Sequence, residues 1–272
     1  MTAGLSLLFA TLIGVFITPD GIVVGADTAI SSRAGQSVRA KYCVTGPRSV
    51  STLQGVYELT DTETRATVAL YDRFREFCAE IDRTQLPPML RGKAEYIAEA
   101  LRAALERFLT DVPAVEVVRQ YGSSPIVARI AVSGYDAQGP SSVVVGLGIA
   151  TDRATNKWEV QVRDLSRLTL RECGVRFHGQ EVVVLSLRSN TDLRVPRSER
   201  QKPDVEKLGA LIGGSCSDVS IGSAPRLFTE AARLTVTFGK GFGIQPGIVG
   251  LPLDIVVIPK DGTIDVLHVN SW

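Results

Sequence analysis

The order of patterned segments along the chain predicts an α+β fold. Apolar, β-branched runs separated by turn residues come first, two amphipathic segments follow, and further apolar runs with one more amphipathic segment complete the sequence. Helices that are grouped between antiparallel hairpins favour a layered α+β domain over a doubly wound parallel sheet. Several apolar runs lack polar alternation, which is typical of strands buried on both faces. We therefore expect a four-layer αββα sandwich, in which helices cover two stacked sheets.

The first strands are predicted to form a hairpin. Apolar runs at 12–17 and 22–26 flank the turn Thr-Pro-Asp-Gly, in which Pro presets φ, Asp bonds its own backbone and Gly accepts positive φ. Thr11 precedes the first run and Asp27 ends the second. Because a hairpin folds these positions back beside each other, we expect a hydroxyl and a carboxylate at one edge of a sheet.

Apolar residues at three- and four-residue spacing predict three helices. The first lies within 60–81 and opens at Thr60-Asp-Thr-Glu63, which has the spacing of a capping box. The second covers 90–108, and the third covers 224–238. The third helix is expected to turn Leu227, Ala231, Leu234 and Val236 inward.

The remaining segments are predicted as strands and loops of one domain. Strands are expected at 38–45, 49–53, 126–136, 141–150, 158–165, 253–258 and 263–269, with a polar loop at 28–37 and an ambiguous apolar element at 177–187. The stretch 188–207 is polar and interrupted by prolines, which indicates a surface insertion. We expect a single domain over 11–272 that carries this insertion at 188–207.

Composition excludes several classes of function. The 272 residues carry a net charge of only +1, which argues against nucleic-acid binding because that needs clustered Lys and Arg. The four cysteines form no CxxC pair, so we expect four buried thiols in a reducing compartment and neither a metal site nor a cofactor.

The N-terminal segment is apolar and uncharged over its first nineteen residues. Residues 1–10 are interpreted as a propeptide or a signal remnant, because the uninterrupted apolar run is too short to span a bilayer. The expected location is the cytoplasm, with export as the alternative if residues 1–10 belong to a signal segment.

Several stretches resemble one known family. The opening Thr11-Leu-Ile-Gly-Val and Thr-Pro-Asp-Gly-Ile-Val-Val-Gly-Ala-Asp27-Thr28 look like the start of proteasome-type β subunits, the threonine branch of the N-terminal nucleophile (Ntn) hydrolases. Lys41, Gly55, Ser133-Gly-Tyr-Asp-Ala-Gln-Gly-Pro140 and Leu253-Asp-Ile-Val-Val-Ile-Pro-Lys-Asp-Gly262 agree in order, so the resemblance spans about 11 to 270. It implies a bacterial proteasome-like protein that acts on a peptide or amide substrate and forms a homo-oligomer.

The resemblance also implies a set of site residues. Thr11 is the expected nucleophile, Asp27 the orienting carboxylate, Lys41 the cation and Gly55 the backbone donor to an oxyanion. An N-terminal Thr can use its own amine as the base, since that amine has an unperturbed pKa of about 7.7–8.0. A nearby Lys lowers this pKa, and a carboxylate keeps the Lys charged. By the same resemblance Ile30 and Ser31, which follow Asp27, line the substrate pocket.

The sequence also departs from this family. Pro246 and Val249 stand near positions where an active member carries Asp and Ser, and Ala29 replaces a basic residue. Thr11 is preceded by ten residues, so its amine is free only after their removal. Two hypotheses follow: a threonine-type Ntn amidohydrolase, most simply a peptidase, or a non-catalytic proteasome-like subunit that acts as a binding or assembly module.

Each candidate residue has a structural alternative. Thr11 can be an ordinary strand residue, Asp27 a strand terminator, Lys41 a solvated lysine on an edge strand, and Gly55 a turn residue. His178 and His268 are isolated and are expected to be structural. The glycine-rich stretch 239–243 is expected to cap a helix and form a loop, because it lacks a preceding strand.

Overall fold

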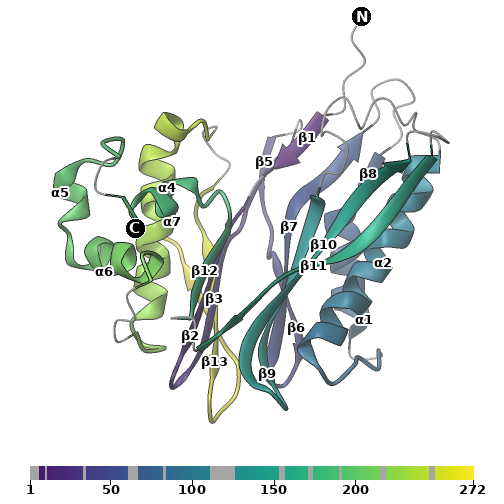
Figure 1. The fold of residues 1–272 in the computed structure, drawn as a ribbon, viewed down its shortest axis with the longest axis horizontal. Coiled ribbons are helices and arrows are strands. Elements are labelled where there is room, and N and C mark those ends of the chain that lie inside the picture. The colour runs from purple at the N-terminus through teal and green to yellow at the C-terminus, as the bar shows by residue number, and fades with distance from the viewer. Residues whose placement is uncertain are drawn as a thin grey trace, which may run out of the picture.

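The structure is a computed structural model that describes residues 6–9, 11–32, 35–60, 67–81, 84–110, 126–152, 157–170, 174–189, 192–214, 219–244 and 249–272. This part of the chain is an α+β fold with two large antiparallel sheets, a two-stranded sheet and six α-helices (Figure 1).

The smaller of the two large sheets contains the predicted hairpin. Its order is β12-β2-β3-β13-β14, and every residue of β2 and β3 is buried. At the turn, the Thr18 hydroxyl donates to Asp20 at 2.6 Å and accepts from the Gly21 N–H at 3.1 Å, as expected for this turn chemistry. The strands are β2 (Leu12–Thr18), β3 (Gly21–Asp27), β12 (Val175–Gly179), β13 (Leu253–Pro259) and β14 (Asp265–Val269).

The larger sheet has the order β1-β7-β9-β10-β11, and β6 and β8 also pair with β7. Its strands are β1 (Ser6–Phe9), β6 (Tyr42–Gly46), β7 (Ser49–Thr60), β8 (Thr67–Ala69), β9 (Ile126–Asp136), β10 (Gly139–Asp152) and β11 (Lys157–Thr169). Strands β4 (Ala29–Ser32) and β5 (Gly35–Val38) form the two-stranded sheet, so the expected polar loop at 28–37 was wrong. The pairing joins backbone groups, which polar side chains do not prevent.

The helices lie in two groups (Figure 1). Helices α1 (Leu70–Glu80) and α2 (Leu90–Thr110) pack on the larger sheet, whereas α4 (Val182–Ser186), α5 (Arg197–Arg200), α6 (Pro203–Ile212), α7 (Ala224–Phe238) and the 3-10 turn η3 (Gly239–Phe242) lie beside the smaller one. The first helix begins at Leu70 and not near Thr60, because 67–69 pairs with β7 as β8. Val236 is 45% exposed, in contrast to its predicted inward orientation.

The segment 188–207 is partly helical. It contains α5 and the first residues of α6, and Val195 and Val205 pack into the apolar cluster under α7. Although this stretch is mostly polar in composition, Val195 and Val205 are therefore buried in the core.

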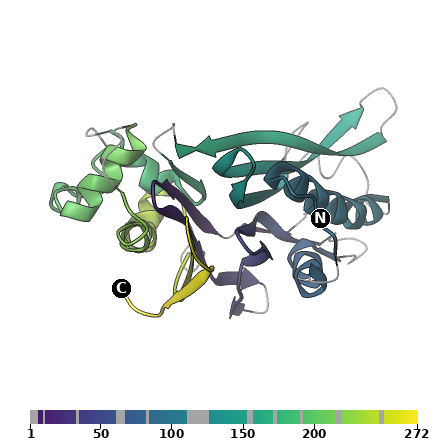
Figure 2. The same cartoon turned by 90° about the horizontal axis from the view of Figure 1, so that it is seen from below.

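The predicted four-layer αββα sandwich is not clearly formed. The apolar cluster between the large sheets takes its buried residues mainly from β2, β3 and β13; of the side chains that the structure describes in the larger sheet, Val50 and Leu168 are its buried members. Small and polar residues occupy much of the facing surface of that sheet; for example, Ser133 Oγ donates to Ser142 Oγ at 2.9 Å. The expectation of two sheets that are buried on both faces holds only for strands of the smaller sheet, fully for β2 and β3, whereas its β14 is largely exposed. Figure 2 shows the long β10–β11 hairpin along one side of the molecule.

Two cysteines are paired, which corrects the expectation of four free thiols. Cys43 in β6 and Cys78 in α1 form a disulfide with a Cα–Cα distance of 5.7 Å. Cys173 and Cys216 lie outside the described residues. Among the helices that the structure describes, none combines the length and the apolar character needed to cross a membrane.

Candidate functional site

Asp27 and Lys41 form an ion pair inside the protein. Asp27 ends β3, Lys41 directly precedes β6, and neither side chain is exposed. Lys41 Nζ lies 3.0 Å from Asp27 Oδ2 and donates to the Ala29 carbonyl at 2.6 Å. Lys41 is therefore not a solvated lysine on an edge strand.

The Asp27 carboxylate also reaches the residue that follows Thr11. The Leu12 N–H donates to Asp27 Oδ1 at 2.7 Å, so one carboxylate joins the start of β2 to the Lys41 ammonium group. Thr11 is 2% exposed and lies just before β2, outside any strand. The hairpin thus brings Thr11 and Asp27 to one edge of the sheet, as the sequence predicted.

Burial acts on both charges of the pair. Loss of solvent raises the pKa of Asp27 and lowers the pKa of Lys41, and the attraction between the two groups opposes both shifts. The Leu12 N–H, which donates to the ionised form of Asp27, also opposes the rise in the pKa of Asp27. A charged pair in this position requires both partners, since either charge alone would be buried without compensation.

A small cavity opens beside Thr11. Its volume is about 150 Å³, and its lining combines residues of four strands or strand ends. The Gln180 N–H donates to the Thr11 carbonyl at 2.9 Å and fixes the end of β12 against Thr11. The lining residues are Thr11, Gln54, Gly55, Ile126, Ala128, Arg129, Gly179 and Gln180.

Two glycines permit this close packing. Gly55 has φ +111° and pairs with Ala128, and a Cβ there would lie 2.6 Å from the Val127 carbonyl oxygen. Gly179 has φ +92°, and a Cβ there would collide with the Thr11 carbonyl oxygen. Gly55 therefore lies inside β7 at a point of close backbone approach, and the alternative of a turn glycine was wrong.

Sequence reasoning missed three polar residues of this cavity. Gln54, Arg129 and Gln180 line it, and no motif singled them out. Arg129 carried the one available signal, since it is the only charged residue in the otherwise apolar run 126–132.

The structure describes the other predicted site residues only in part. Ile30 and Ser31 lie in β4, where they pair with Ser37 and Gln36 of β5; the structure does not describe the Ile30 and Ser31 side chains. Pro246 lies outside the described residues. Val249 is 5% exposed and packs in the apolar cluster of the smaller sheet, where it supplies no polar group.

The two histidines and the glycine-rich stretch lie in ordinary structural positions. His178 pairs with Ile13 across β12 and β2, and burial, with help from Arg176 and Arg129, lowers its pKa to about 4. His268 Nδ1 lies 2.7 Å from Asp254 Oδ1. The stretch 239–243 is a 3-10 turn that ends at Gly243 with φ +81°, which confirms a helix end and loop. The described residues contain no cluster of His, Cys, Asp and Glu suited to a metal.

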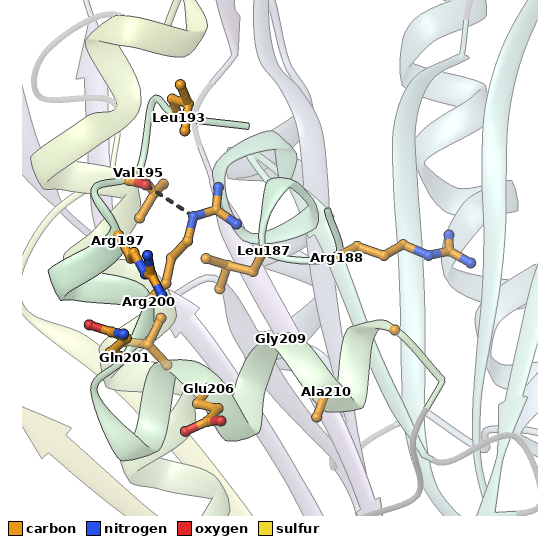
Figure 3. Close-up of a pocket in the computed structure, with 12 residues that line it drawn as sticks. Leu187, Arg188, Leu193, Val195, Arg197, Arg200, Gln201, Glu206, Gly209 and Ala210 are labelled. Atoms are coloured by element: carbon orange, nitrogen blue, oxygen red, sulfur yellow. Dashed lines mark hydrogen bonds between the residues drawn. The ribbon is translucent and has the colours of Figure 1, made fainter. Parts of the chain in front are cut away.

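A larger cavity of about 790 Å³ lies elsewhere, among α4, α5 and α6 (Figure 3). Leu187, Val195 and Val205 contribute apolar lining, while the Arg200 guanidinium is held by the carbonyls of Val195 and Ser189. Of the predicted site residues whose side chains the structure describes, namely Thr11, Asp27, Lys41 and Gly55, none lines it. The larger cavity is therefore not the better candidate for an active site, because the polar groups that could react lie at the smaller cavity.

Comparison with known proteins supports the fold. The solved structures that match include a Gly-1 mutant of Anbu from Hyphomicrobium sp. strain MC1, at 13% identity and a TM-score of 0.53. They also include Anbu, described as an ancestral β-subunit, from Yersinia bercovieri, at 12% identity and a TM-score of 0.52. The matches cover 96% of this chain in both cases, and 88% and 87% of the two Anbu chains. The sequence itself matches neither a family model nor a curated protein.

These findings correct the resemblance read from the sequence. With no match to a family model, the identification of the chain as a proteasome-type β subunit or threonine Ntn hydrolase has no support from sequence comparison. The structural likeness to Anbu shows a proteasome-related fold at low identity. The pattern of hairpins and helices thus indicated the fold but did not establish the family.

Proposed function

We propose that this protein is a threonine-type amidohydrolase that cleaves peptide bonds, with Thr11 as its N-terminal nucleophile once residues 1–10 are removed. The observation that carries the proposal is the fully buried Asp27–Lys41 pair, whose carboxylate also holds the Leu12 N–H next to Thr11. A buried ion pair is weak evidence for stability, since desolvation opposes it. The ion pair contacts Leu12, the residue that follows Thr11, and this position favours a role in activating Thr11.

In the proposed reaction the free amine of Thr11 acts as the base. It takes the proton of the Thr11 hydroxyl while Oγ1 attacks the carbonyl carbon of the substrate. The C–N bond of the substrate then breaks, the leaving amine receives the proton, and an ester to Thr11 remains. Water, activated by the same amine, hydrolyses this ester and regenerates Thr11.

The neighbouring residues have separate tasks. The Lys41 ammonium group disfavours protonation of the amine and stabilises the ionised hydroxyl, and Asp27 keeps Lys41 charged and oriented. The Gly55 N–H is proposed to donate to the oxyanion, a contribution worth about 2.7–4 kcal/mol in other enzymes. Ile30 and Ser31 remain proposed substrate contacts, and assembly into a homo-oligomer remains a prediction.

One observation favours a second function. Val249, near a position where a supporting hydroxyl was expected, is buried in an apolar cluster. A protein with this proteasome-like fold but without that support could act as a non-catalytic binding or assembly module.

Intact mass measured on the purified protein separates the two functions. Loss of residues 1–10, labelling of the new terminus by a threonine-directed electrophile, and cleavage of peptide substrates are expected for the hydrolase. Thr11→Ala should abolish cleavage and labelling while leaving the circular dichroism spectrum unchanged, and Thr11→Ser should retain partial activity. A chain with a free Thr11 that neither reacts with the electrophile nor cleaves peptides would favour the binding module.

A further inference from the structure

Among the described residues that line the cavity beside Thr11, one is charged, Arg129. Arg129 lies in β9 directly opposite Gln54 of β7, and directly opposite residues of an antiparallel pair project from the same face of the sheet. Gln54 Nε2 comes within 3.1 Å of the position that a Cβ on Gly179 would occupy. Arg129 and Gln54 therefore line the cavity beside Thr11 from the same face of the larger sheet.

Arg129 has no direct polar partner among the described residues. It makes no hydrogen bond or ion pair of 4.0 Å or less with any of them, whereas at longer range its charge lowers the pKa of Glu181 and of His178. Glu181 Oε2 is buried without a hydrogen-bond partner in the described part of the chain. Burial raises the pKa of Glu181, and the lowered pKa of His178, about 4, keeps that ring neutral at physiological pH.

The size of the cavity limits what it can hold. A volume of about 150 Å³ is below the 300–1,000 Å³ that is typical of sites for drug-sized ligands. It suits a single short side chain or terminal group. A carboxylate matches the planar donor array of a guanidinium, and an amide N–H can add a further bond.

We propose that this cavity is a subsite for a carboxylate of the substrate, with Arg129 as the specificity-determining residue and Gln54 as a supporting donor. The inference rests on the proposed function for its substrate and predicts a peptidase that prefers an acidic residue, or a free carboxyl terminus, next to the cleaved bond. Recognition of the carboxylate does not require the catalytic step, so binding can be measured separately.

The first test compares two probes that differ mainly in charge. The α-amides of N-acetyl-L-glutamate and N-acetyl-L-glutamine, which carry one carboxylate and none, are titrated into the wild-type protein and followed by NMR. We expect the glutamate to bind about tenfold more tightly, the size of one charge-assisted hydrogen bond. Arg129→Met should remove the difference, and Arg129→Lys should retain part of it.

Arg163→Met is a matched control. Arg163 lies on β11 opposite Gly146, which also lies opposite Arg129, so both arginines share one row across the sheet, but Arg163 does not line the cavity. This variant should keep the preference for the acidic probe. Equal binding of the two probes to the wild-type protein, or an unchanged preference in Arg129→Met, would overturn the proposal.

Cleavage assays separate this inference from the proposed function. Peptides that carry Glu or Gln at one position at a time are compared as substrates of the wild-type protein and Arg129→Met. Preference for Glu that depends on Arg129 supports both ideas, whereas cleavage without any charge preference overturns the subsite alone. Preferential binding of the acidic probe with no cleavage of any peptide would support the carboxylate site and remove the peptidase.

Discussion

Lys41 Nζ lies 3.0 Å from Asp27 Oδ2, and neither side chain is exposed to solvent. Asp27 ends β3 and Lys41 directly precedes β6, and these two strands belong to different sheets. This pair of charges therefore links the two large sheets, and Asp27 also accepts a hydrogen bond from the N–H of Leu12, the residue after Thr11.

Breaking this ion pair should strongly lower the free energy of unfolding. Lys41→Met leaves the Asp27 carboxylate buried without its cation and should lower the free energy of unfolding by about 3–5 kcal/mol, measured by urea denaturation. Asp27→Asn combined with Lys41→Met should recover part of the loss, because no unpaired charge remains. Arg39→Met is the control: its ion pair with Asp72 is about half exposed and should contribute about 1 kcal/mol or less. Similar losses in the two single variants would contradict a buried charged pair.

Gly179 should tolerate no side chain. In Gly179→Ala the new Cβ meets the Thr11 carbonyl oxygen in addition to the strain of positive φ, so we expect a loss of about 2–5 kcal/mol in thermal or urea unfolding. Gly139→Ala is a close control, since Gly139 has nearly the same φ of +93° but no atom within 4 Å of its Cβ position. Its loss should be about 1–2 kcal/mol. If the two variants are equally stable, β12 does not pack against Thr11 as described.

His178 should make the protein less stable in acid. Its pKa of about 4 in the folded state lies below the ordinary value of 6.5, so the unfolded chain binds the proton more readily between these values. Stability from the neutral ring is complete above about pH 6.5 and is lost as the pH falls toward 4, up to about 3 kcal/mol. His178→Gln should flatten the profile of unfolding free energy against pH over this range. Parallel profiles for the variant and the wild type would show that the ring is not held neutral.

The disulfide between Cys43 and Cys78 should stabilise the packing of α1 on the sheet. The half-cystines are 35 residues apart, and closing such a loop contributes about 2–4 kcal/mol to the free energy of unfolding. Peptide mapping without reductant should recover the linked peptides. A reductant should lower the melting temperature of the wild type but leave Cys78→Ser unchanged; an equal response in both would assign the effect to other thiols.

Local chemistry made much of the fold predictable. The Thr-Pro-Asp-Gly turn between two apolar runs specified the β2–β3 hairpin, and the apolar stripes of α2 and α7 specified helices close to their observed bounds. The same hairpin placed Thr11 near Asp27. These features depend on residues close together in sequence, where turn geometry and helical or strand periodicity act directly.

Other features had no local signal. The start of α1 moved because β8 pairs with β7, and β4 and β5 pair although their residues are polar. The disulfide joins β6 to α1, and nothing in the spacing of the four cysteines indicated it. The prediction of a regular four-layer sandwich was wrong because the sequence does not show which residues share a face of the larger sheet. The polar face of that sheet is apparent only once the strand register is known.

The sequence by itself determined an α+β chain, its first hairpin, its long helices and a hydroxyl beside a carboxylate at a sheet edge. Only the tertiary structure decided that Lys41 is buried against Asp27, and that Gln54, Arg129 and Gln180 surround Thr11. The physical reason is the separation along the chain. A turn or a helical stripe is set by neighbouring residues, whereas a cavity built from β7, β9 and β12 depends on how strands that are far apart in the sequence align with one another.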